Sequence, residues 1–273
     1  MALFLLIALV MVNFAANSLL NRAGIDVFGM DALGFAGVRL AAGAVMLAGL
    51  VAWRRKAARI TAARWVGALW LLVYLVPFSL AYVTLPSGVG ALVLFGVVQV
   101  TMFAGAALAG VRPGIRAYAG MGVAMAGLAW LLWPRADVAF DPLGLTYMAV
   151  AGIGWGLFSL RGRGSADPLG DMAWSFVLLM PVALVLMVLG TGWSAAGVAI
   201  GVVCGAVTSG LGYALWYRAL PQITATTAAV AQLSVPVIAL LAGAALLGEA
   251  LGLQVLLGAG VVLGGIALAV IKR

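Results

Sequence analysis

Amide, hydroxyl and aromatic side chains recur at helical spacing inside long apolar segments of this sequence. Asn13 and Asn17, for example, lie four residues apart and therefore share one face of a helix. Such side chains can hold a small solute by hydrogen bonds and ring contacts, although they can equally join one helix to the next. The candidate substrate-binding residues are Asn13, Asn17, Tyr74, Phe78, Tyr82, Phe95, Gln99, Trp155, Phe158, Ser159, Tyr213, Trp216, Gln232 and Ser234.

Three further residues are predicted to have structural or gating roles. Arg39 lies inside an apolar segment and stays charged at any relevant pH. We expect it to pair with a helix end or a polar neighbour rather than with a substrate carboxylate. Pro236 lacks a backbone donor and can bend its helix beside Gln232 and Ser234. Glu249 closes the same segment at its outer end.

Several kinds of chemistry are missing from the sequence. It has no His, a single Cys and no acidic residue that is clearly inside an apolar segment. We therefore expect no metal site, no cofactor and no catalytic residue. An intramembrane enzyme would need a Ser/Lys dyad, paired Asp residues or a His-containing metal motif, so the chain is not expected to be an enzyme. An ion channel would need a ring of acids or a carbonyl filter, and neither pattern is present.

The composition identifies the solvent of this chain. Hydrophobic residues make up 66% of the sequence and charged residues only 8%, which is too few to cover the surface of a soluble domain of this length. The sequence therefore predicts an all-α integral membrane protein in a lipid bilayer. The net charge of +8 comes without a basic patch interleaved with aromatic residues, so we expect no nucleic-acid partner. The apolar N-terminus is interpreted as a first transmembrane helix rather than as a signal peptide.

Ten apolar segments are long enough to span a bilayer, which takes roughly 20 residues each. Twelve of the 15 basic residues fall on one side when the segments alternate in direction, and this predicts that both termini are cytoplasmic in a multi-pass protein of the bacterial inner (plasma) membrane. The predicted spans are about 2–21, 32–53, 63–85, 88–110, 114–133, 142–161, 170–190, 194–217, 223–247 and 252–271.

Short motifs of the first half return in the second. "YVTLP" at 82–86 matches "YRALP" at 217–221, and "GAAL" at 105–108 matches "GAAL" at 243–246. Five glycines of the first half have counterparts at the same offset as the second pair. We therefore predict two five-helix repeats, residues 1–137 and 138–273. Because five is an odd number, the second repeat must cross the membrane in the opposite sense, as in many secondary transporters.

The stretch "GYALWYRALPQITATTAAVAQLSVPVIALLAGAALLGEAL" (212–251) resembles the EamA-type branch of the drug/metabolite transporter superfamily, and "FAGVRLAAG" (35–43) resembles the Arg-bearing second helix of that family. Within it, the bacterial YddG-type amino-acid exporters are the nearest likeness. The resemblance implies that spans 1, 3, 4, 6, 8 and 9 surround a central cavity and that spans 5 and 10 are peripheral. The first half departs from the pattern, since Val98 and Val111 stand where Pro236 and Glu249 stand in the second.

Together these features predict a secondary transporter that exports small neutral or zwitterionic metabolites, foremost amino acids and including aromatic or other apolar ones. Alternating access through a central cavity is expected, and the lack of a titrating group inside the spans favours facilitated diffusion. A proton-coupled exporter of hydrophobic drugs or other metabolites is the alternative. The expected partners are a small-molecule substrate and the bilayer, and the protein is expected to be a monomer, with a dimer left open.

Overall fold

The computed structural model describes residues 2–54, 61–108, 114–133, 140–162, 165–219, 222–223, 231–232 and 234–270. All regular secondary structure in these ranges is helical, as the sequence predicts. The predicted domain boundary between residues 137 and 138 and several of the basic loop positions lie outside the described residues.

The first half of the chain contributes five long helices. Helix α1 continues into a short π-helical turn, η1, and the other four are separate. Their bounds are α1 Ala2–Arg22, η1 Ala23–Val27, α2 Ala32–Trp53, α3 Ala62–Ala81, α4 Ser87–Leu108 and α5 Ile115–Leu132. The predicted span 63–85 is therefore shorter than expected, because the chain turns at Tyr82–Leu85 before α4 begins.

The second half contains two interrupted helices among its elements. A π-helical segment, η2, joins α9 to α10 without a break in the helix, whereas α7 and α8 meet at an angle. The bounds are α6 Pro142–Gly162, α7 Pro168–Leu178, α8 Met180–Leu189, α9 Ala195–Val203, η2 Cys204–Leu211, α10 Gly212–Ala219, α12 Ser234–Leu247 and α13 Leu253–Val270.

The predicted span 170–190 is bent rather than straight. Helices α7 and α8 differ in direction by 41° at Leu179. Pro181 is the second residue of α8, where its missing N–H removes no hydrogen bond from the new helix but prevents α7 from continuing unchanged. Pro77, by contrast, lies inside an uninterrupted α3. Of the two prolines, only Pro181 therefore marks a break between helices.

Six helices in the described part of the chain are long and apolar enough to cross a membrane, or seven if α7 and α8 form one bent span. Three shorter apolar helices, at Ile115–Leu131, Ser234–Leu247 and Leu253–Ala269, have 10–17 residues each. A multi-pass membrane protein follows from these lengths and compositions. The predicted count of ten spans stays a prediction.

Side-chain caps begin several helices and explain why they start where they do. The Asp31 carboxylate accepts hydrogen bonds from the backbone N–H groups of Leu33 and Gly34 at the start of α2, at 2.9 and 3.1 Å. Ser194 caps α9 in the same way. Each cap satisfies backbone donors that have no partner within the helix, and in an apolar chain these donors would otherwise be costly to bury.

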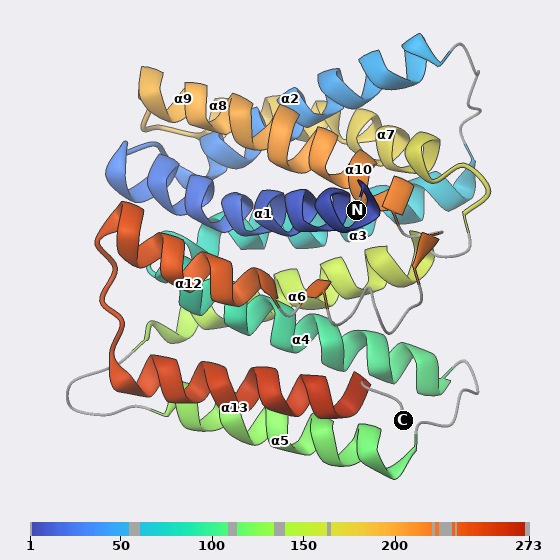
Figure 1. Ribbon diagram of the computed structural model, residues 1–273. Coiled ribbons are helices and arrows are strands. Elements are labelled where there is room, and N and C mark those ends of the chain that lie inside the picture. The colour runs from blue at the N-terminus through green and yellow to red at the C-terminus, as the bar shows by residue number, and fades with distance from the viewer. Residues whose placement is uncertain are drawn as a thin grey trace.

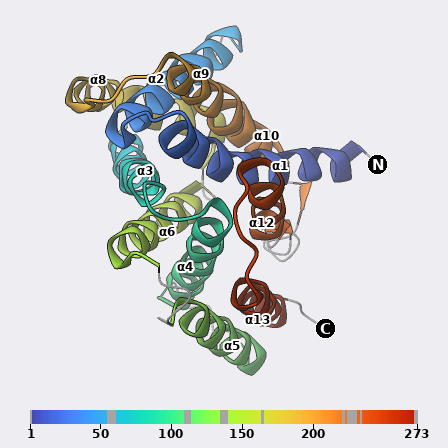
Figure 2. The ribbon, with the colours of Figure 1, turned by 90° about the vertical axis from the view of Figure 1, so that its left-hand side faces the viewer.

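The helices lie roughly parallel or antiparallel in one bundle (Figure 1). Figure 2 views most of them close to end-on, with α5 and α13 side by side at one edge and α2, α8 and α9 toward the opposite edge. Helices α1, α3, α4, α6, α10 and α12 lie between these edges. The first turn of α1 and the last turn of α13 both lie in the right-hand half of Figure 1.

Helices α5 and α13 approach each other at glycines. A Cβ atom added to Gly120 would lie 2.5 Å from the Gly265 carbonyl oxygen, and one added to Gly265 would lie 2.7 Å from the Gly120 carbonyl oxygen. The backbones therefore touch with no side chain between them, the packing that small residues permit between helices in a bilayer. The Gly and Ala residues of these two segments therefore let α5 and α13 pack at close range.

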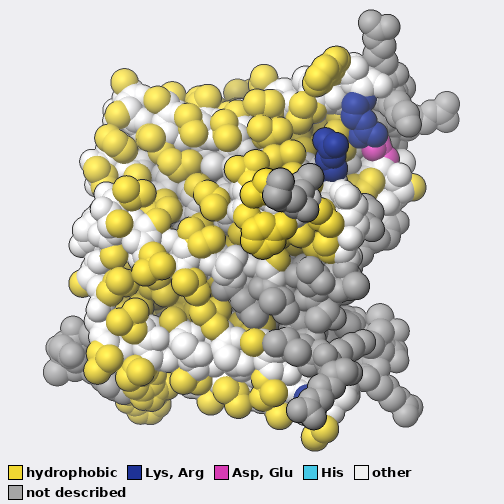
Figure 3. Space-filling model, viewed as in Figure 1, with side chains coloured by type: hydrophobic (Ala, Val, Ile, Leu, Met, Phe, Trp, Pro, Cys, Tyr) yellow, Lys and Arg dark blue, Asp and Glu magenta, His cyan; other side chains and the backbone are white. Residues whose placement is uncertain are grey.

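The face shown in Figure 3 is largely hydrophobic, and the charged side chains visible on it lie toward its right-hand side. Large apolar side chains such as Leu108 and Val188 are more than 80% exposed. A water-facing surface rarely carries contiguous apolar area of this extent, whereas lipid tails cover it at no cost.

Candidate functional site

A single arginine lies at the centre of the bundle. Arg39, on α2, is 0% exposed, and its guanidinium reaches groups from three other helices. Its Nε donates to Ser209 Oγ at 3.0 Å, and its Nη2 lies 3.2 to 3.4 Å from Tyr74 Oη, Tyr213 Oη and Asn17 Oδ1. The guanidinium of Arg39 is therefore surrounded by hydroxyl and amide oxygens. Its remaining nitrogen, Nη1, is buried without a hydrogen-bond partner.

Aromatic faces complete the surroundings of the guanidinium. The carbon at its centre lies 4.9 Å from the centroid of the Phe78 ring and 5.6 Å from that of the Tyr74 ring. An arginine in this geometry gains about 0.5–2 kcal/mol per favourable cation–π contact. Such contacts offset only part of the cost of burying a charge.

Asn17 is the hub of the polar groups around Arg39. Its Oδ1 accepts from Thr208 Oγ1 at 2.7 Å, from Ser209 Oγ at 3.1 Å and from Arg39. Asn21, one turn further along α1, accepts from Ser79 Oγ at 2.7 Å and donates to Cys204 Sγ at 3.4 Å. The amide stripe of α1 therefore faces α3 and η2 rather than lipid.

Rings form a continuous cluster beside the guanidinium. Trp155 contacts Tyr74 and Tyr213, with ring centroids 4.9 and 4.8 Å apart, and stacks on Phe158 at 5.8 Å. The Tyr74 and Tyr213 hydroxyls lie 3.1 Å apart, so α3 and α10 meet directly beside Arg39. We call the following residues the Arg39 cluster: Phe14, Asn17, Arg39, Tyr74, Phe78, Tyr82, Trp155, Phe158, Ser209, Tyr213 and Trp216.

The cluster contains eight of the 14 candidate substrate-binding residues. They come from α1, α3, α6 and α10, four of the six spans that the resemblance places around the cavity. The eight are Asn17, Tyr74, Phe78, Tyr82, Trp155, Phe158, Tyr213 and Trp216, and all of them are at least 90% buried. These eight side chains therefore pack against one another between the helices.

The other six candidates lie elsewhere in the packing. Asn13 is half-buried and donates to the Leu9 carbonyl of its own helix, and Ser234 donates to the Ala231 carbonyl. Phe95 and Gln99 are buried on α4, Ser159 is half-buried on α6, and Gln232 is buried ahead of α12. Pro236, the predicted bend, is the third residue of α12 and is buried.

Some members of this centre were not among the candidates. Phe14 lies between Trp155, Tyr213 and Trp216, with centroid distances of 5.7 to 6.1 Å. Unlike Asn13 and Asn17, Phe14 could not be identified from the sequence, because a lone Phe in an apolar helix does not differ from the apolar residues around it. Thr208 and Ser209 were visible as hydroxyls in an apolar segment, but only the fold shows that they face Asn17.

Glu249 holds one end of the bundle together. Its carboxylate accepts from the backbone N–H and the hydroxyl of Ser87 at 2.6 and 2.8 Å, and so caps the start of α4. The turn that presents it uses Gly248 in the left-handed region, at φ +67°. Arg22 donates to the carbonyls of Tyr82 and Val83 at the same end. We call this the Glu249 end.

An open cavity of about 420 Å³ lies at the Glu249 end. It is bordered by the end of α1, the start of α4 and the connection between α12 and α13, and its charged lining residues are Arg22, Asp26 and Glu249. This is within the usual size range of a site for a small molecule.

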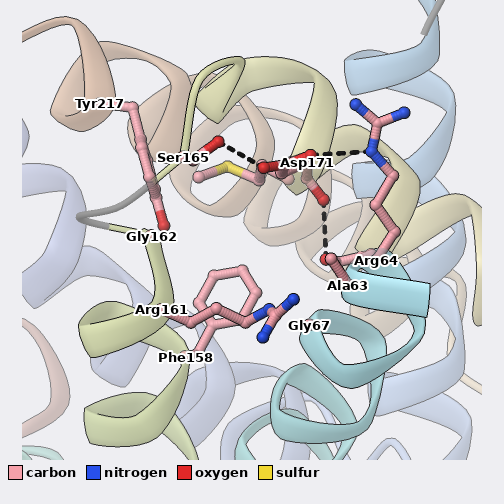
Figure 4. A pocket seen from close by; sticks show the side chains of 11 residues that line it. Ala63, Arg64, Gly67, Phe158, Arg161, Gly162, Ser165, Asp171 and Tyr217 are labelled. Carbon is pink, nitrogen blue, oxygen red and sulfur yellow. Dashed lines mark hydrogen bonds and ion pairs between the residues drawn. The ribbon is translucent and has the colours of Figure 1, made fainter. Parts of the chain in front are cut away.

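A second network holds the opposite end, where α3 begins and α6 and α10 finish. Arg64 Nε donates to Asp171 Oδ1 at 2.8 Å, and Ser165 donates to the same carboxylate, as Figure 4 shows. A small cavity of about 30 Å³, enough for about one water molecule, lies between these groups and Phe158. We call this the Arg64 end. Phe158 therefore lies between the Arg64 end and the ring cluster.

Asp141 lies just before α6, outside the spans. Hydrogen bonds from the Gly144 N–H and the Thr84 hydroxyl hold the pKa of this carboxyl below its ordinary value. Within the residues that the structure covers, no three His, Cys, Asp or Glu side chains gather into a possible metal site.

Known proteins resemble this chain along most of its length. An "Uncharacterized protein PA1977" of Pseudomonas aeruginosa is 45% identical over 273 residues, which cover 98% of this chain and 94% of that one. A solved structure described only as "Crystal structure of protein" is 18% identical, with a TM-score of 0.68 over 95% of this chain and 97% of its own, and it shares the fold. The model of the EamA-like transporter family matches residues 142–271. With its apolar helices and this match, the chain belongs to the EamA-like transporter family.

Proposed function

We propose that this transporter exports amino acids, including aromatic and other apolar ones, through the Arg39 cluster. The observation that carries the proposal is the cluster itself, in which hydroxyl and amide groups and a cation lie against a wall of aromatic rings. An amino acid carries a charged polar part and a side chain that is often apolar. A site with both kinds of surface fits such a molecule better than it fits a purely hydrophobic drug.

The proposed architecture is ten spans in two inverted repeats. Packing between elements supports it, because several of the main contacts between the halves have a counterpart with the halves exchanged. Helix α3 packs on α6 while α1 packs on η2 and α10, and α4 packs on α6 while α1 packs on α12. Three further contacts, α2 with α7 and α8, α4 with α12 and α5 with α13, join corresponding elements of the two halves.

The proposed orientation puts both termini and the Arg64 end in the cytoplasm. The distribution of Lys and Arg supports this orientation. A tag inserted after Pro86 is then external and one inserted after Pro221 internal. Labelling each tag in intact cells tests the orientation, and equal labelling of both tags would contradict it.

Alternating access would work by opening one end at a time. At the Glu249 end, three connections pack together around the Ser87 cap, and the open cavity there provides a vestibule for release. At the Arg64 end, the arginine joins α3 to α7, and Phe158, a member of the Arg39 cluster, lines the small cavity there. Breaking the contacts at one end while the other stays closed would expose the cluster to one side only.

The proposed mode of transport is facilitated diffusion, without coupling to a proton gradient. The described acidic residues lie at the ends of helices rather than in their middles, so the cluster offers no carboxylate to carry a proton. Net flux would then follow the amino-acid gradient.

Counterflow of labelled amino acids into proteoliposomes tests the proposal, measured at several imposed pH gradients. We expect exchange that depends on internal unlabelled amino acid and little on the pH gradient. If no amino acid exchanges, the substrate assignment is wrong. Strong stimulation by a proton gradient would instead favour the proton-coupled exporter.

Substitutions in the site make the same assay specific. Tyr82→Ala, Trp155→Ala and Tyr213→Ala should each lower exchange, with the largest loss at Trp155 because of its ring contacts within the cluster. Leu108→Ala is a matched control, since that side chain is 89% exposed on the apolar surface. Unaltered exchange in all three site variants, with folded protein recovered, would remove the proposed site.

A further inference from the structure

Arg39 has no carboxylate partner, and the described acidic residues show why none is available. Each of the six is held at an end of the bundle. Asp26 pairs with Arg22, Asp31 caps α2, Asp141 is held by Thr84 and Gly144, Asp167 and Asp171 pair with Arg64, and Glu249 caps α4. The charge at the centre is therefore balanced by no opposite charge among the described residues.

One of the three guanidinium nitrogens of Arg39 lacks a hydrogen-bond acceptor. Nε and Nη2 are occupied by hydroxyl and amide oxygens of Ser209, Asn17 and the two tyrosines. Nη1 has two N–H groups and no acceptor, although Arg39 is 0% exposed. Burying a charged group with unused donors is unfavourable unless something else binds there, and such local conflicts concentrate at functional sites.

The position of Nη1 connects it to the proposed transport path. Arg39 is hydrogen-bonded to α1, α3, η2 and α10, elements from both halves of the chain. The Tyr74–Tyr213 hydroxyl contact beside it joins α3 to α10. A solute would reach Nη1 only when these helices separate, so binding at Arg39 would be coupled to the opening of the bundle.

We infer that Nη1 of Arg39 binds the carboxylate of the transported solute and selects carboxylates over amides, esters and amines of the same shape. This rests on the proposed function and names the group by which its site recognises a substrate. A guanidinium suits a carboxylate because its N–H groups make charge-assisted hydrogen bonds to carboxylate oxygens, and Nη1 still has two N–H groups to donate. The neighbouring rings of Tyr74, Phe78 and Trp155 would contact the apolar part of the same molecule.

Ligand-dependent thermal unfolding of the purified full-length protein tests the inference. The probes are L-phenylalanine, L-phenylalaninamide, which lacks the carboxylate, and phenyllactate, which lacks the amino group. We expect the two carboxylates to raise the Tm of the wild type and the amide to do so at least tenfold more weakly by concentration. In Arg39→Met, the advantage of the carboxylates should disappear.

Two variants keep the test decisive. Arg39→Lys retains the charge but not the paired donors, and it should bind the carboxylates at least tenfold more weakly even if Arg39→Met fails to fold. Arg64→Met removes the other buried arginine, and it should keep the full difference between phenylalanine and its amide.

The outcomes distinguish a failure of the Arg39 inference from a failure of the amino-acid export proposal. Equal binding of phenylalanine and its amide overturns the Arg39 inference, even if amino acids are transported. Arg39-dependent binding of phenyllactate without binding of any amino acid supports the inference and overturns amino-acid export. If chloride alone, added to a sulfate buffer, reproduces the Arg39-dependent rise in Tm, the site holds an inorganic anion and the inference is wrong. It is also wrong if neither phenyllactate nor any amino acid stabilises the wild type.

Discussion

Arg64 and Arg39 are both buried, and their positive charges are stabilised by different kinds of partner. Arg64, at the end of the bundle, is 7% exposed and pairs with Asp171 at 2.8 Å and with Asp167 at 3.8 Å. Arg39, at the centre, is completely buried and is bonded to hydroxyl and amide oxygens. The charge of Arg64 is neutralised by carboxylates of the chain, whereas Arg39 has no carboxylate partner among the described residues.

The difference follows from where each residue stands relative to water. The side chains of Asp167 and Asp171 are 38% and 41% exposed, so they stay hydrated while they neutralise Arg64. A carboxylate beside Arg39 would have to be buried entirely, at a large desolvation cost, and it would occupy Nη1 permanently. Under the proposed function, the absence of such a carboxylate among the described residues leaves Nη1 available to the carboxylate of a solute.

The largest expected effect on stability is at Arg64. Arg64→Met removes the cation and leaves two carboxylates unpaired beside α7, so we expect the free energy of unfolding to fall by about 1–3 kcal/mol, below the value for a fully buried pair because the acids are partly hydrated. Unfolding in mixed detergent micelles measures it. Double replacement of Arg64 and Asp171 should cost less than the sum of the single changes, and additive losses would show that the pair does not stabilise the fold.

The same substitution at Arg39 should raise the free energy of unfolding or leave it unchanged. Arg39→Met keeps the volume and removes an unbalanced charge, so we expect the free energy of unfolding to stay constant or to rise by up to about 2 kcal/mol. Counterflow should nevertheless fall at least tenfold. A loss of stability as large as that of Arg64→Met would contradict the contrast and would make Arg39 a structural residue.

A smaller effect is expected from the hydroxyls that stand in for a counter-ion. Tyr74→Phe removes an oxygen that lies 3.2 Å from Arg39 Nη2, and we expect a loss of about 1 kcal/mol. In an Arg39→Met background at least half of this loss should disappear, since no charge is left to satisfy. The same double-mutant cycle with Thr101→Ala, whose hydroxyl bonds only the Val97 carbonyl in the described structure, should show no coupling.

The smallest effect concerns Asp141, which is exposed to water. Because its pKa is lowered in the folded state, its contribution to stability is present above the ordinary pKa of an aspartate and is lost as the pH falls through the lowered value. The difference in Tm between the wild type and Asp141→Asn should therefore shrink on acidification below about pH 4. A difference that stays constant down to pH 2 would contradict this assignment. Arg39→Met should show no comparable change with pH relative to the wild type.

The sequence predicted those parts of the fold that depend on local properties such as segment length and hydrophobicity. The lengths of the apolar segments predicted the helices, and the break at Pro181 fell within a predicted span at a residue that can cause it. The end of α3 at Ala81 was missed, since Tyr82–Leu85 is as apolar as the helix before it and the turn depends on contacts with Arg22. The number of spans stays a prediction.

The candidate site was accessible to a similar degree. Helical spacing identified the faces of α1 and α3 that carry Asn17, Tyr74 and Phe78, and these faces do meet. Helical spacing could not show that these faces, and not the equally regular stripe with Phe95 and Gln99 on α4, form the Arg39 cluster. It also could not find Phe14, because an apolar ring in an apolar helix differs from its neighbours only by what packs against it.

The sequence by itself determined the solvent, the helical elements and the face of each helix that bears polar groups, because these depend on composition and on a period of 3.6 residues. Only the tertiary structure decided which faces meet. It therefore decided that Arg64 has carboxylate partners and that Arg39 has none among the described residues. The reason is physical: the charge balance of a buried group depends on residues far away in the chain, as Arg39 and Tyr213 illustrate, and no local pattern encodes their distance.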